Sequence, residues 1–196
     1  MTMTKESTKD RILTHAARIV RENGFNNTGI LEILESAGVP KGSFYFYFKS
    51  KDDLGLALID YYAEFFAMMS ESSLRSAESS PLERLEKFFR GFRIFCEQED
   101  RTSGCPIGNL TQEMGVLNEA FRAKLREVFN RMKAAIKECL EQAHAQNEID
   151  PRLEPDETAD FILNSWEGAL IRMKAEGNTG PLILLEKMVF GHILNR

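Results

Sequence analysis

Three consecutive residues, Lys41, Gly42 and Ser43, have the chemistry needed to approach a base edge in a nucleic-acid groove. The Lys41 ammonium can donate to guanine O6 or N7 or to a phosphate, and the Ser43 hydroxyl can donate or accept. Gly42 has no side chain, so the backbone there can come close to DNA.

The aromatic residues that follow divide into an inward pair and a set available for contact. Phe44 and Phe48 are four residues apart, so on a helix they share one face, which we expect to be buried. Tyr45 and Tyr47 then project from the other side, where a phenol can bond to a phosphate oxygen or stack on a sugar. Phe46 occupies an exposed position and must pack on DNA, on sugar or on the first helix.

The elements that must position these side chains are two short helices and a tight turn. Apolar spacing over residues 30–37 predicts the first, Gly38 ends it, and Pro40 begins the second at the favoured first position. This is the minimum of a helix-turn-helix, in which the start of the second helix enters the major groove. Lys51 begins the next helix beside free backbone N–H groups, which suits an anchored phosphate. Thr28 completes the candidate DNA-binding set.

Helical spacing dominates the rest of the chain, and no segment predicts a strand. A first helix is expected from a capping box at Ser7-x-x-Asp10 to a left-handed Gly24. Later helices are expected from Ser50, from Ser80-Pro81 and over residues 118–146, followed by two more. The predicted fold class is all-α with about nine helices. The expected domains are residues 1–50, a connecting helix and loop at 51–80, and a larger domain at 81–196.

Charge and cysteine usage limit the class of protein. The chain carries a net charge of −5, but residues 1–51 carry +3 and the remainder −8. This distribution suits a protein that touches phosphates with one end only, although chance gives the same pattern. Three cysteines argue against a secreted disulfide framework. Neither a signal peptide nor an apolar run of about 18 residues is found, so we expect a cytoplasmic protein without membrane contact.

Enzymatic and metal chemistry are not expected. The three histidines, His15, His144 and His192, are far apart and lack paired ligand spacing. No glycine-rich phosphate loop occurs, and no serine or cysteine has a recognisable catalytic partner. We therefore expect no catalytic residue, no metal and no cofactor.

Cys105 is the one thiol with a distinctive sequence context. In Ser103-Gly104-Cys105-Pro106 the proline suits a first helical residue, which makes Cys105 the N-cap. The helix dipole and the nearby Arg101 are expected to lower the pKa of this thiol and make it reactive. The alternative is a buried, inert cysteine, and we expect packing roles for Cys96 and Cys139.

The order of motifs from Ile12 to Leu58, including the Phe-Tyr-Phe-Tyr-Phe-Lys-Ser-Lys tail, resembles the TetR/AcrR-type repressor family. The resemblance implies a three-helix DNA-binding domain, a connecting fourth helix, helices that enclose an effector, and a dimer interface built by the last two helices. By position, residues 41–43 and Tyr45 would lie near bases, and Tyr47 and Lys51 would contact phosphates. The implied function is a dimeric repressor released from operator DNA by a small-molecule effector. The alternative on the same scaffold is a redox or electrophile sensor acting through Cys105.

Two positions depart from the family pattern. Gly29 stands where a Ser or Thr usually caps the second helix, so a hydroxyl contact to phosphate is lost. Leu31 occupies a place often filled by a polar or basic base-contacting residue. More of the specificity should therefore rest on the second helix of the motif.

The implied effector site would be apolar with a few polar groups, and each candidate could equally be core. Its candidates are the following residues: Phe88, Phe92, Phe95, Cys105, Asn109, Gln112, Glu113, Phe129 and Trp166. In the last two helices, a stripe at Ile162, Trp166, Leu170 and Met173 could be monomer core or dimer seam. The pair Gly168-Ala169 would allow close helix approach and slightly favours the seam.

Overall fold

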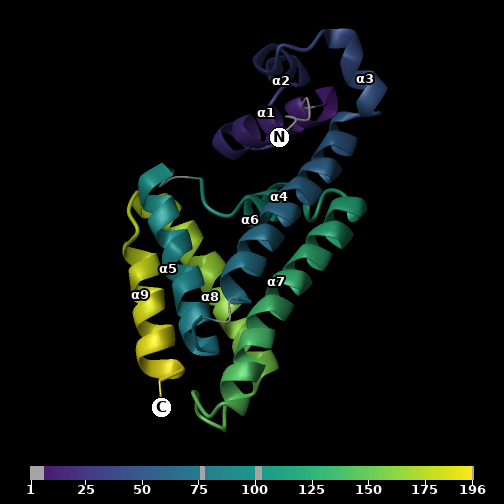
Figure 1. The fold of residues 1–196 in the computed structure, drawn as a ribbon. Helices are drawn as coiled ribbons and strands as arrows, with labels where there is room; N and C mark the ends of the chain where they lie inside the picture. The colour runs from purple at the N-terminus through teal and green to yellow at the C-terminus, as the bar shows by residue number, and fades with distance from the viewer. Residues whose placement is uncertain (1–6, 76–77, 100–102, 196) are drawn as a thin grey trace. The chain divides into compact units, whose positions relative to one another are not determined.

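The computed structural model describes residues 7–75, 78–99 and 103–195, and over these residues the chain is helical with no strand (Figure 1). The all-α prediction is confirmed, with nine α-helices in the described part of the chain. They are α1 Thr8–Asn23, α2 Ile30–Ala37, α3 Phe44–Tyr47, α4 Lys51–Leu74, α5 Pro81–Glu99, α6 Pro106–Met114, α7 Glu119–Ala145, α8 Pro155–Glu176 and α9 Gly180–Met188. A 3-10 turn, Lys41–Ser43, precedes α3, and a π-helical turn, Val189–Ile193, extends α9.

The ends of α1 and α2 follow the signals in the sequence. Ser7 caps α1, because its hydroxyl accepts a hydrogen bond from the Asp10 amide at 3.1 Å. Gly24 ends α1 with φ +85°, and Gly38 ends α2 with φ +61°. Both values lie in the left-handed region, where a side chain would be strained. These two glycines therefore fix the length of each helix and the direction in which the chain leaves it.

The compact units of the fold follow packing rather than chain order. One unit, called unit 1 here, runs to Phe65 and includes Asn109–Leu125. The other, unit 2, comprises Phe66–Gly108 and Arg126–Arg196. This division differs from the expected boundaries at residues 50 and 80, because the end of α6 and the start of α7 belong with the N-terminal helices. Helices α4, α6 and α7 each have residues in both units.

Unit 1 has a continuous apolar core beneath α1, α2 and α3. Its fully buried residues include Ile12, Phe25, Ile33, Phe44, Phe48, Leu54, Leu58 and Phe121. The Phe25 and Phe121 rings lie 5.5 Å apart. The buried Tyr62 hydroxyl of α4 donates to the Ala17 carbonyl of α1 at 2.8 Å, and burial raises its pKa. The first helix is thus fastened to α4 by both apolar packing and a buried hydrogen bond.

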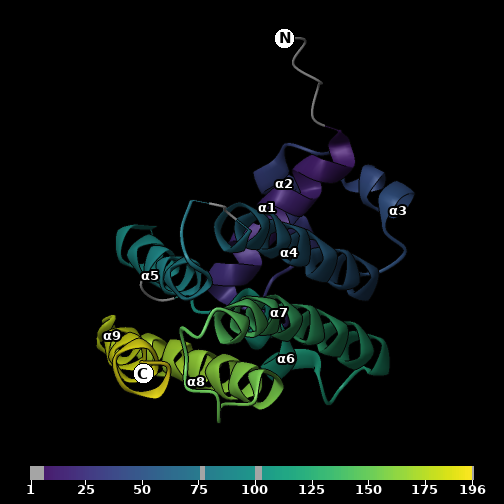
Figure 2. The ribbon, with the colours of Figure 1, turned by 60° about the horizontal axis from the view of Figure 1, so that its bottom comes forward.

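Unit 2 is built around the packing of α5, α8 and α9, and the last two lie side by side in both views (Figures 1 and 2). Trp166 of α8 is buried between two rings of α5, with centroids 4.8 Å from Phe89 and 5.3 Å from Phe92. The Arg93 guanidinium of α5 donates to Glu186 of α9 at 2.8 Å. Aromatic packing and this ion pair therefore hold α5 to its neighbours.

The stripe on α8 that the sequence left open belongs to the core of unit 2. Ile162, Trp166, Leu170 and Met173 are each at most 4% exposed. A different face of α8 faces outward, and Phe161 on it is half exposed. In the described part of the chain, no helix is long and apolar enough to cross a membrane.

Candidate nucleic-acid interface

The second helix of the motif, residues 41–47 and called the recognition segment here, begins as a 3-10 turn and becomes α-helical only at Phe44. Pro40 is its N-cap rather than the expected first helical residue, because its ψ of 141° is extended. Phe44 and Phe48 are buried as predicted, with ring centroids 5.6 Å apart. These two rings anchor α3 in the core of unit 1 and set which of its faces is outward.

The outward face of this segment carries residues at helical spacing. Gly42, Tyr45 and Phe46 are exposed at positions i, i+3 and i+4, and Lys41 is exposed beside them. Lys49 is also exposed, but it follows the extended Phe48 that ends α3. Phe46 is 83% exposed, which is unusual for a phenylalanine without a partner surface. It touches the Tyr47 ring edge-on at 5.0 Å and leaves its own face open. Cations, a phenol and an open aromatic face are the groups that bind phosphates and the apolar edges of bases.

Two candidate contacts are less available than expected, namely Ser43 and Tyr47. Both are half-buried rather than exposed. Each still has part of its side chain at the surface, beside the exposed face formed by Tyr45 and Phe46. Six of the eight DNA-binding candidates therefore gather on the 3-10 turn and α3, namely Lys41, Gly42, Ser43, Tyr45, Phe46 and Tyr47.

The structure contradicts the prediction that Thr28 belongs to the DNA-binding surface. Its side chain is only 1% exposed, and its hydroxyl donates to the Gly24 carbonyl at 2.7 Å. The hydroxyl therefore closes the turn between α1 and α2 and does not face solvent. Sequence reasoning missed this because a threonine next to a helix start has the same signature whether it serves the turn or a phosphate.

Gly29 supplies no side-chain cap to α2, and only the reciprocal contact from Glu32 is present. The Glu32 carboxylate accepts from the Gly29 amide at 3.4 Å and from the Asn23 side chain at 3.1 Å. Gly29 itself has extended backbone angles that fit an N-cap. Leu31, the second residue of α2, is half exposed. The first helix of the motif therefore begins without a side-chain acceptor for its first-turn amides, and it presents an apolar side chain where the family pattern has a polar one.

Lys51 has partners within the protein. Its ammonium donates to the Asn26 carbonyl at 3.0 Å and lies 4.9 Å from the centre of the Phe25 ring. The side chain is half-buried at the start of α4, where Ser50 caps the helix as expected by accepting from the Asp53 amide at 3.0 Å. A phosphate contact by Lys51 would have to share the ammonium with the turn between α1 and α2.

The effector candidates fall into separate groups. Phe88, Phe92 and Trp166 belong to the aromatic core of unit 2, where Phe88 also meets Phe66 at 5.7 Å. Phe95 lies on α5 with 36% exposure, and Phe129 is half-buried on α7. These five are the candidates with apolar side chains.

The polar effector candidates lie on α6, in the part of that helix that belongs to unit 1. Asn109 is half-buried and Gln112 is exposed. Glu113 is engaged elsewhere: its carboxylate accepts from the backbone amides of Phe25 at 3.0 Å and Asn26 at 2.8 Å. Glu113 therefore holds the turn between α1 and α2, a role that nothing local in the sequence indicated.

Cys105 stands directly before α6 as expected, and its sulfur accepts from the Gly108 amide at 3.4 Å. The expected fall in its pKa is wrong. Burial raises the pKa of this thiol, and the neighbouring Glu167 carboxyl raises it further. Burial outweighs the helix dipole because the thiolate would lose its hydration. Arg101, the expected cationic neighbour, lies outside the described residues.

Glu167 of α8 is the partner that sequence reasoning missed. Burial raises the pKa of its carboxyl to about 7, and the hydrogen bond with Cys105 opposes that shift. Within the described chain its Oε1 atom has no hydrogen-bond partner. Cys96 and Cys139 are buried in unit 2, and the described residues contain no group of histidine, cysteine or carboxylate side chains suited to a metal ion.

A 3-10 turn with an exposed Lys41 and an aromatic α3 on a buried apolar base, after a glycine-terminated α2, define a helix-turn-helix DNA-binding protein. Residues 12–58 match the family described as "Bacterial regulatory proteins, tetR family", and residues 81–188 match "Tetracyclin repressor-like, C-terminal domain". The chain belongs to the TetR family of DNA-binding transcriptional regulators.

Individual relatives extend over most of the chain. The transcriptional regulator AcuR of Cereibacter sphaeroides is 37% identical over 175 residues, which cover 89% of this chain and 80% of AcuR. The transcriptional repressor DhaR of Mycobacterium sp. strain GP1 is 30% identical over 195 residues, covering 98% and 95%.

Solved structures agree on the fold. The regulatory protein TetR from Rhodobacter sphaeroides superposes with a TM-score of 0.89 at 34% identity, covering 95% of this chain and 98% of that one. The reduced form of Escherichia coli NemR gives a TM-score of 0.86 at 26% identity, covering 95% and 96%. The likeness therefore includes both the helix-turn-helix and the larger C-terminal region.

Proposed function

We propose that this repressor binds a pseudo-palindromic operator as a homodimer through Lys41, Gly42, Ser43, Tyr45, Phe46 and Tyr47, and leaves it when a small molecule binds. The observation that carries the DNA contact is the outward face of α3, where Tyr45 is 65% and Phe46 83% exposed. Both rings stand on the buried pair Phe44 and Phe48, which is a rigid base for base and phosphate contacts.

A binding titration tests the DNA contacts. Labelled DNA from upstream of the coding sequence is titrated with the wild type, with Lys41→Ala, and with Arg126→Ala, an exposed cation on α7 as matched control. Each phosphate contact contributes about 0.9 to the slope of log K against log salt. Losing one contact from each of the two DNA-binding domains of a dimer therefore lowers the slope by about 2. Equal slopes for Lys41→Ala and the control would contradict a phosphate role for Lys41.

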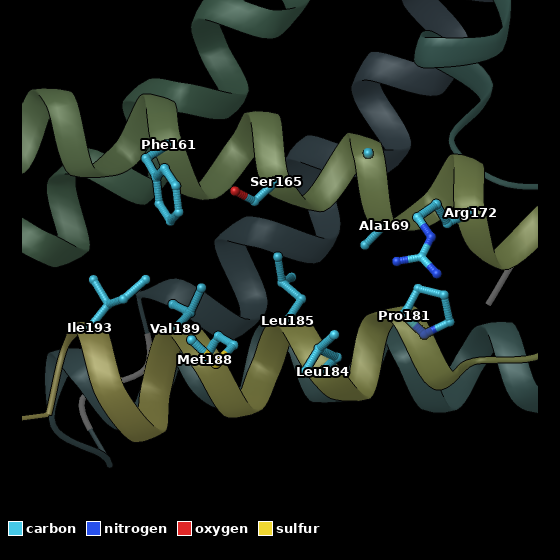
Figure 3. A pocket seen from close by; sticks show the side chains of 11 residues that line it. Phe161, Ser165, Ala169, Arg172, Pro181, Leu184, Leu185, Met188, Val189 and Ile193 are labelled. Carbon is cyan, nitrogen blue, oxygen red and sulfur yellow. The ribbon is translucent and has the colours of Figure 1, made fainter.

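The surface that supports dimerisation is a groove of about 370 Å³ between α8 and α9 (Figure 3). Phe161, Ser165, Ala169 and Arg172 line it from α8, and the side opposite carries mainly aliphatic residues of α9 and the turn after it: Leu184, Leu185, Met188, Val189 and Ile193. Phe161, Leu184 and Met188 are each 45% or more exposed. Apolar side chains on two neighbouring helices, continuous along the groove, suit a four-helix contact with a second copy.

The dimer is tested by sedimentation. Phe161→Glu and Leu184→Glu introduce charges into the proposed seam and are expected to shift the mass from two chains to one. The matched control is Val116→Glu, since Val116 is 90% exposed between α6 and α7. A wild type that sediments as a monomer at micromolar concentration would contradict the dimer, and so would seam variants that stay dimeric.

The support for an effector site is the aromatic cluster of unit 2, which includes Phe88, Phe92 and Trp166. A small molecule that releases the protein must prefer the conformation that does not bind DNA. Native mass spectrometry of the purified protein tests for a co-purifying molecule. Trp166 is the single tryptophan of the sequence, so its fluorescence reports ligand binding in this cluster.

A second candidate is covalent sensing at Cys105, for which Glu167 offers a base beside the thiol, although burial and Glu167 both raise the pKa of that thiol. In this proposal the Glu167 carboxylate accepts the thiol proton as Sγ attacks an electrophilic carbon–carbon double bond. The S–C bond replaces the π bond, and the proton then passes to the adjacent carbon. A carboxyl with a pKa of about 7 can take up and return that proton near neutral pH.

Peptide mapping after treatment with N-ethylmaleimide at pH 7 tests this candidate. We expect an adduct on Cys105, slower labelling in Glu167→Gln, and loss of release from DNA in Cys105→Ser. Labelling at an unchanged rate in Glu167→Gln would contradict the role of Glu167. Release by electrophiles that persists in Cys105→Ser would eliminate covalent sensing at this thiol.

A further inference from the structure

The turn between α1 and α2 is held by a carboxylate from a distant part of the chain. Oε1 of Glu113 accepts from the Phe25 amide at 3.0 Å, and Oε2 accepts from the Asn26 amide at 2.8 Å. Glu113 lies in the last turn of α6, which is separated from this turn by 87 residues of sequence. Two charge-assisted hydrogen bonds to one carboxylate fix both its position and its orientation.

The same turn is held from a second direction. The Lys51 ammonium at the start of α4 donates to the Asn26 carbonyl at 3.0 Å. The Phe25 ring is 2% exposed and packs on Phe121 of α7. The amides, the carbonyl and the ring of this short turn are therefore bound by unit 1 residues of three different helices, α6, α4 and α7.

Gly24 makes room for this arrangement. Its φ of +85° strains any side chain, and a Cβ atom there would lie 3.1 Å from Oε1 of Glu113. A side chain at this position would crowd the carboxylate that binds the next two amides. The absence of a side chain at Gly24, which ends α1, thus also allows the Glu113 carboxylate of α6 to approach the turn.

The turn directly precedes α2 and the recognition segment, so its placement sets where Tyr45 and Phe46 point. We propose that Glu113 is a positioning residue: through two hydrogen bonds it fixes the head, defined as residues 8–48, on α6. This sets operator affinity and tolerance of half-site spacing without touching DNA. The inference rests on the dimeric operator binding proposed above, because spacing matters only when two heads bind together.

The two hydrogen bonds of Glu113 depend on the position of α6. Cys105 precedes the first residue of α6, and Glu113 lies in its last turn. A hydrogen bond is lost when its donor and acceptor move more than about 3.5 Å apart. A displacement of the last turn of α6 by about an ångström would therefore stretch or break the bonds from Glu113 to the Phe25 and Asn26 amides.

The test begins with in vitro selection of an operator by the wild type from random double-stranded DNA. Affinity is then measured by fluorescence anisotropy for the selected operator and for versions with one or two base pairs added between the half-sites. The variants are Glu113→Ala and Glu113→Gln, with Glu119→Ala as matched control, an exposed carboxylate of unit 1 at the start of α7.

We expect Glu113→Ala to bind the selected operator about tenfold more weakly, which is less than the full contribution of two charge-assisted bonds because α1 stays held to α4 by the Tyr62 hydrogen bond. Its penalty for added base pairs should also be at least fivefold smaller than that of the wild type, because a loosely held head tolerates more spacings. Hydrogen exchange of the Phe25 and Asn26 amides should accelerate while the amide of Ile33 stays protected. Glu119→Ala should match the wild type in all three measurements.

A spacing penalty within twofold of the wild type in a folded Glu113→Ala would overturn the proposal. If Glu113→Ala fails to fold, Glu113→Gln decides by the same criterion, because its single acceptor oxygen keeps one of the two bonds. Selection of no operator by the wild type would contradict the proposed function instead, so the two failures are distinguishable.

Discussion

Replacing Glu167 by Gln should make unit 2 less sensitive to pH. The Glu167 carboxyl is buried on α8 beside Cys105, and burial raises its pKa from 4.5 to about 7. Below about pH 4.5 the group is protonated in both the folded and the unfolded chain. As the pH rises from 4.5 to 7, the unfolded chain loses this proton while the folded chain keeps it. Stability therefore falls across this interval and levels off above it.

The size of the effect follows from the shift in pKa. About 2.5 units at 1.36 kcal/mol each amounts to about 3 kcal/mol lost between pH 4.5 and pH 7. The amide of Glu167→Gln cannot ionise, so this contribution disappears. The variant should resemble the wild type at pH 5 and be more stable than it by up to about 3 kcal/mol at pH 8.

Urea unfolding at pH 5, 6, 7 and 8 measures this difference, at one chain concentration so that dimerisation does not enter. Glu157→Gln, an exposed carboxylate on the same helix, is the matched control. Other titrating groups contribute equally to wild type and variants and cancel in the comparison. Parallel pH dependence in the wild type and Glu167→Gln would refute the reasoning, because Glu167 would then ionise equally in both states.

Three further predictions concern unit 1. Tyr62→Phe removes the buried hydrogen bond to the Ala17 carbonyl and should lower the free energy of unfolding by about 1 kcal/mol in urea titrations; an unchanged midpoint would contradict this. Thr28→Val should cost a similar amount of stability yet leave the salt dependence of operator binding unchanged, since its hydroxyl bonds to Gly24; a shallower salt dependence would restore Thr28 as a phosphate contact. Leu31 should contact a thymine methyl group, so replacing one thymine of the selected half-site by uracil should weaken wild-type binding about threefold but leave Leu31→Ala unaffected; equal losses in both proteins at every thymine would exclude the contact.

Local signals predicted the elements of the fold well. The hydroxyl of Ser7, the left-handed glycines at 24 and 38, and the first-turn proline at 81 mark helix ends in the sequence and in the structure. The spacing of Phe44 and Phe48 predicted the buried side of α3. Each of these features depends on residues within one or two helical turns, which is the range that sequence patterns report.

Contacts between distant residues escaped prediction. Glu113 looked like a polar group for an effector, but it binds amides 87 and 88 residues away. Cys105 looked activated by its helix, but burial beside Glu167 reverses the direction of its pKa. Thr28 shows the same limit at short range, because sequence does not tell which side of a turn faces the solvent. Burial and long-range pairing decide these roles, and neither has a local signature.

Hydroxyl-radical footprinting of the wild type on DNA from upstream of its coding sequence tests operator binding by a dimer most directly. Two heads carrying Tyr45 and Phe46 should protect two symmetric patches whose centres lie about one helical turn, 34–36 Å, or a multiple of it apart. The same DNA should show no protection with Lys41→Ala at the same concentration and moderate salt. A single asymmetric patch would contradict the dimer, and no protection at any wild-type concentration would contradict operator recognition at this site.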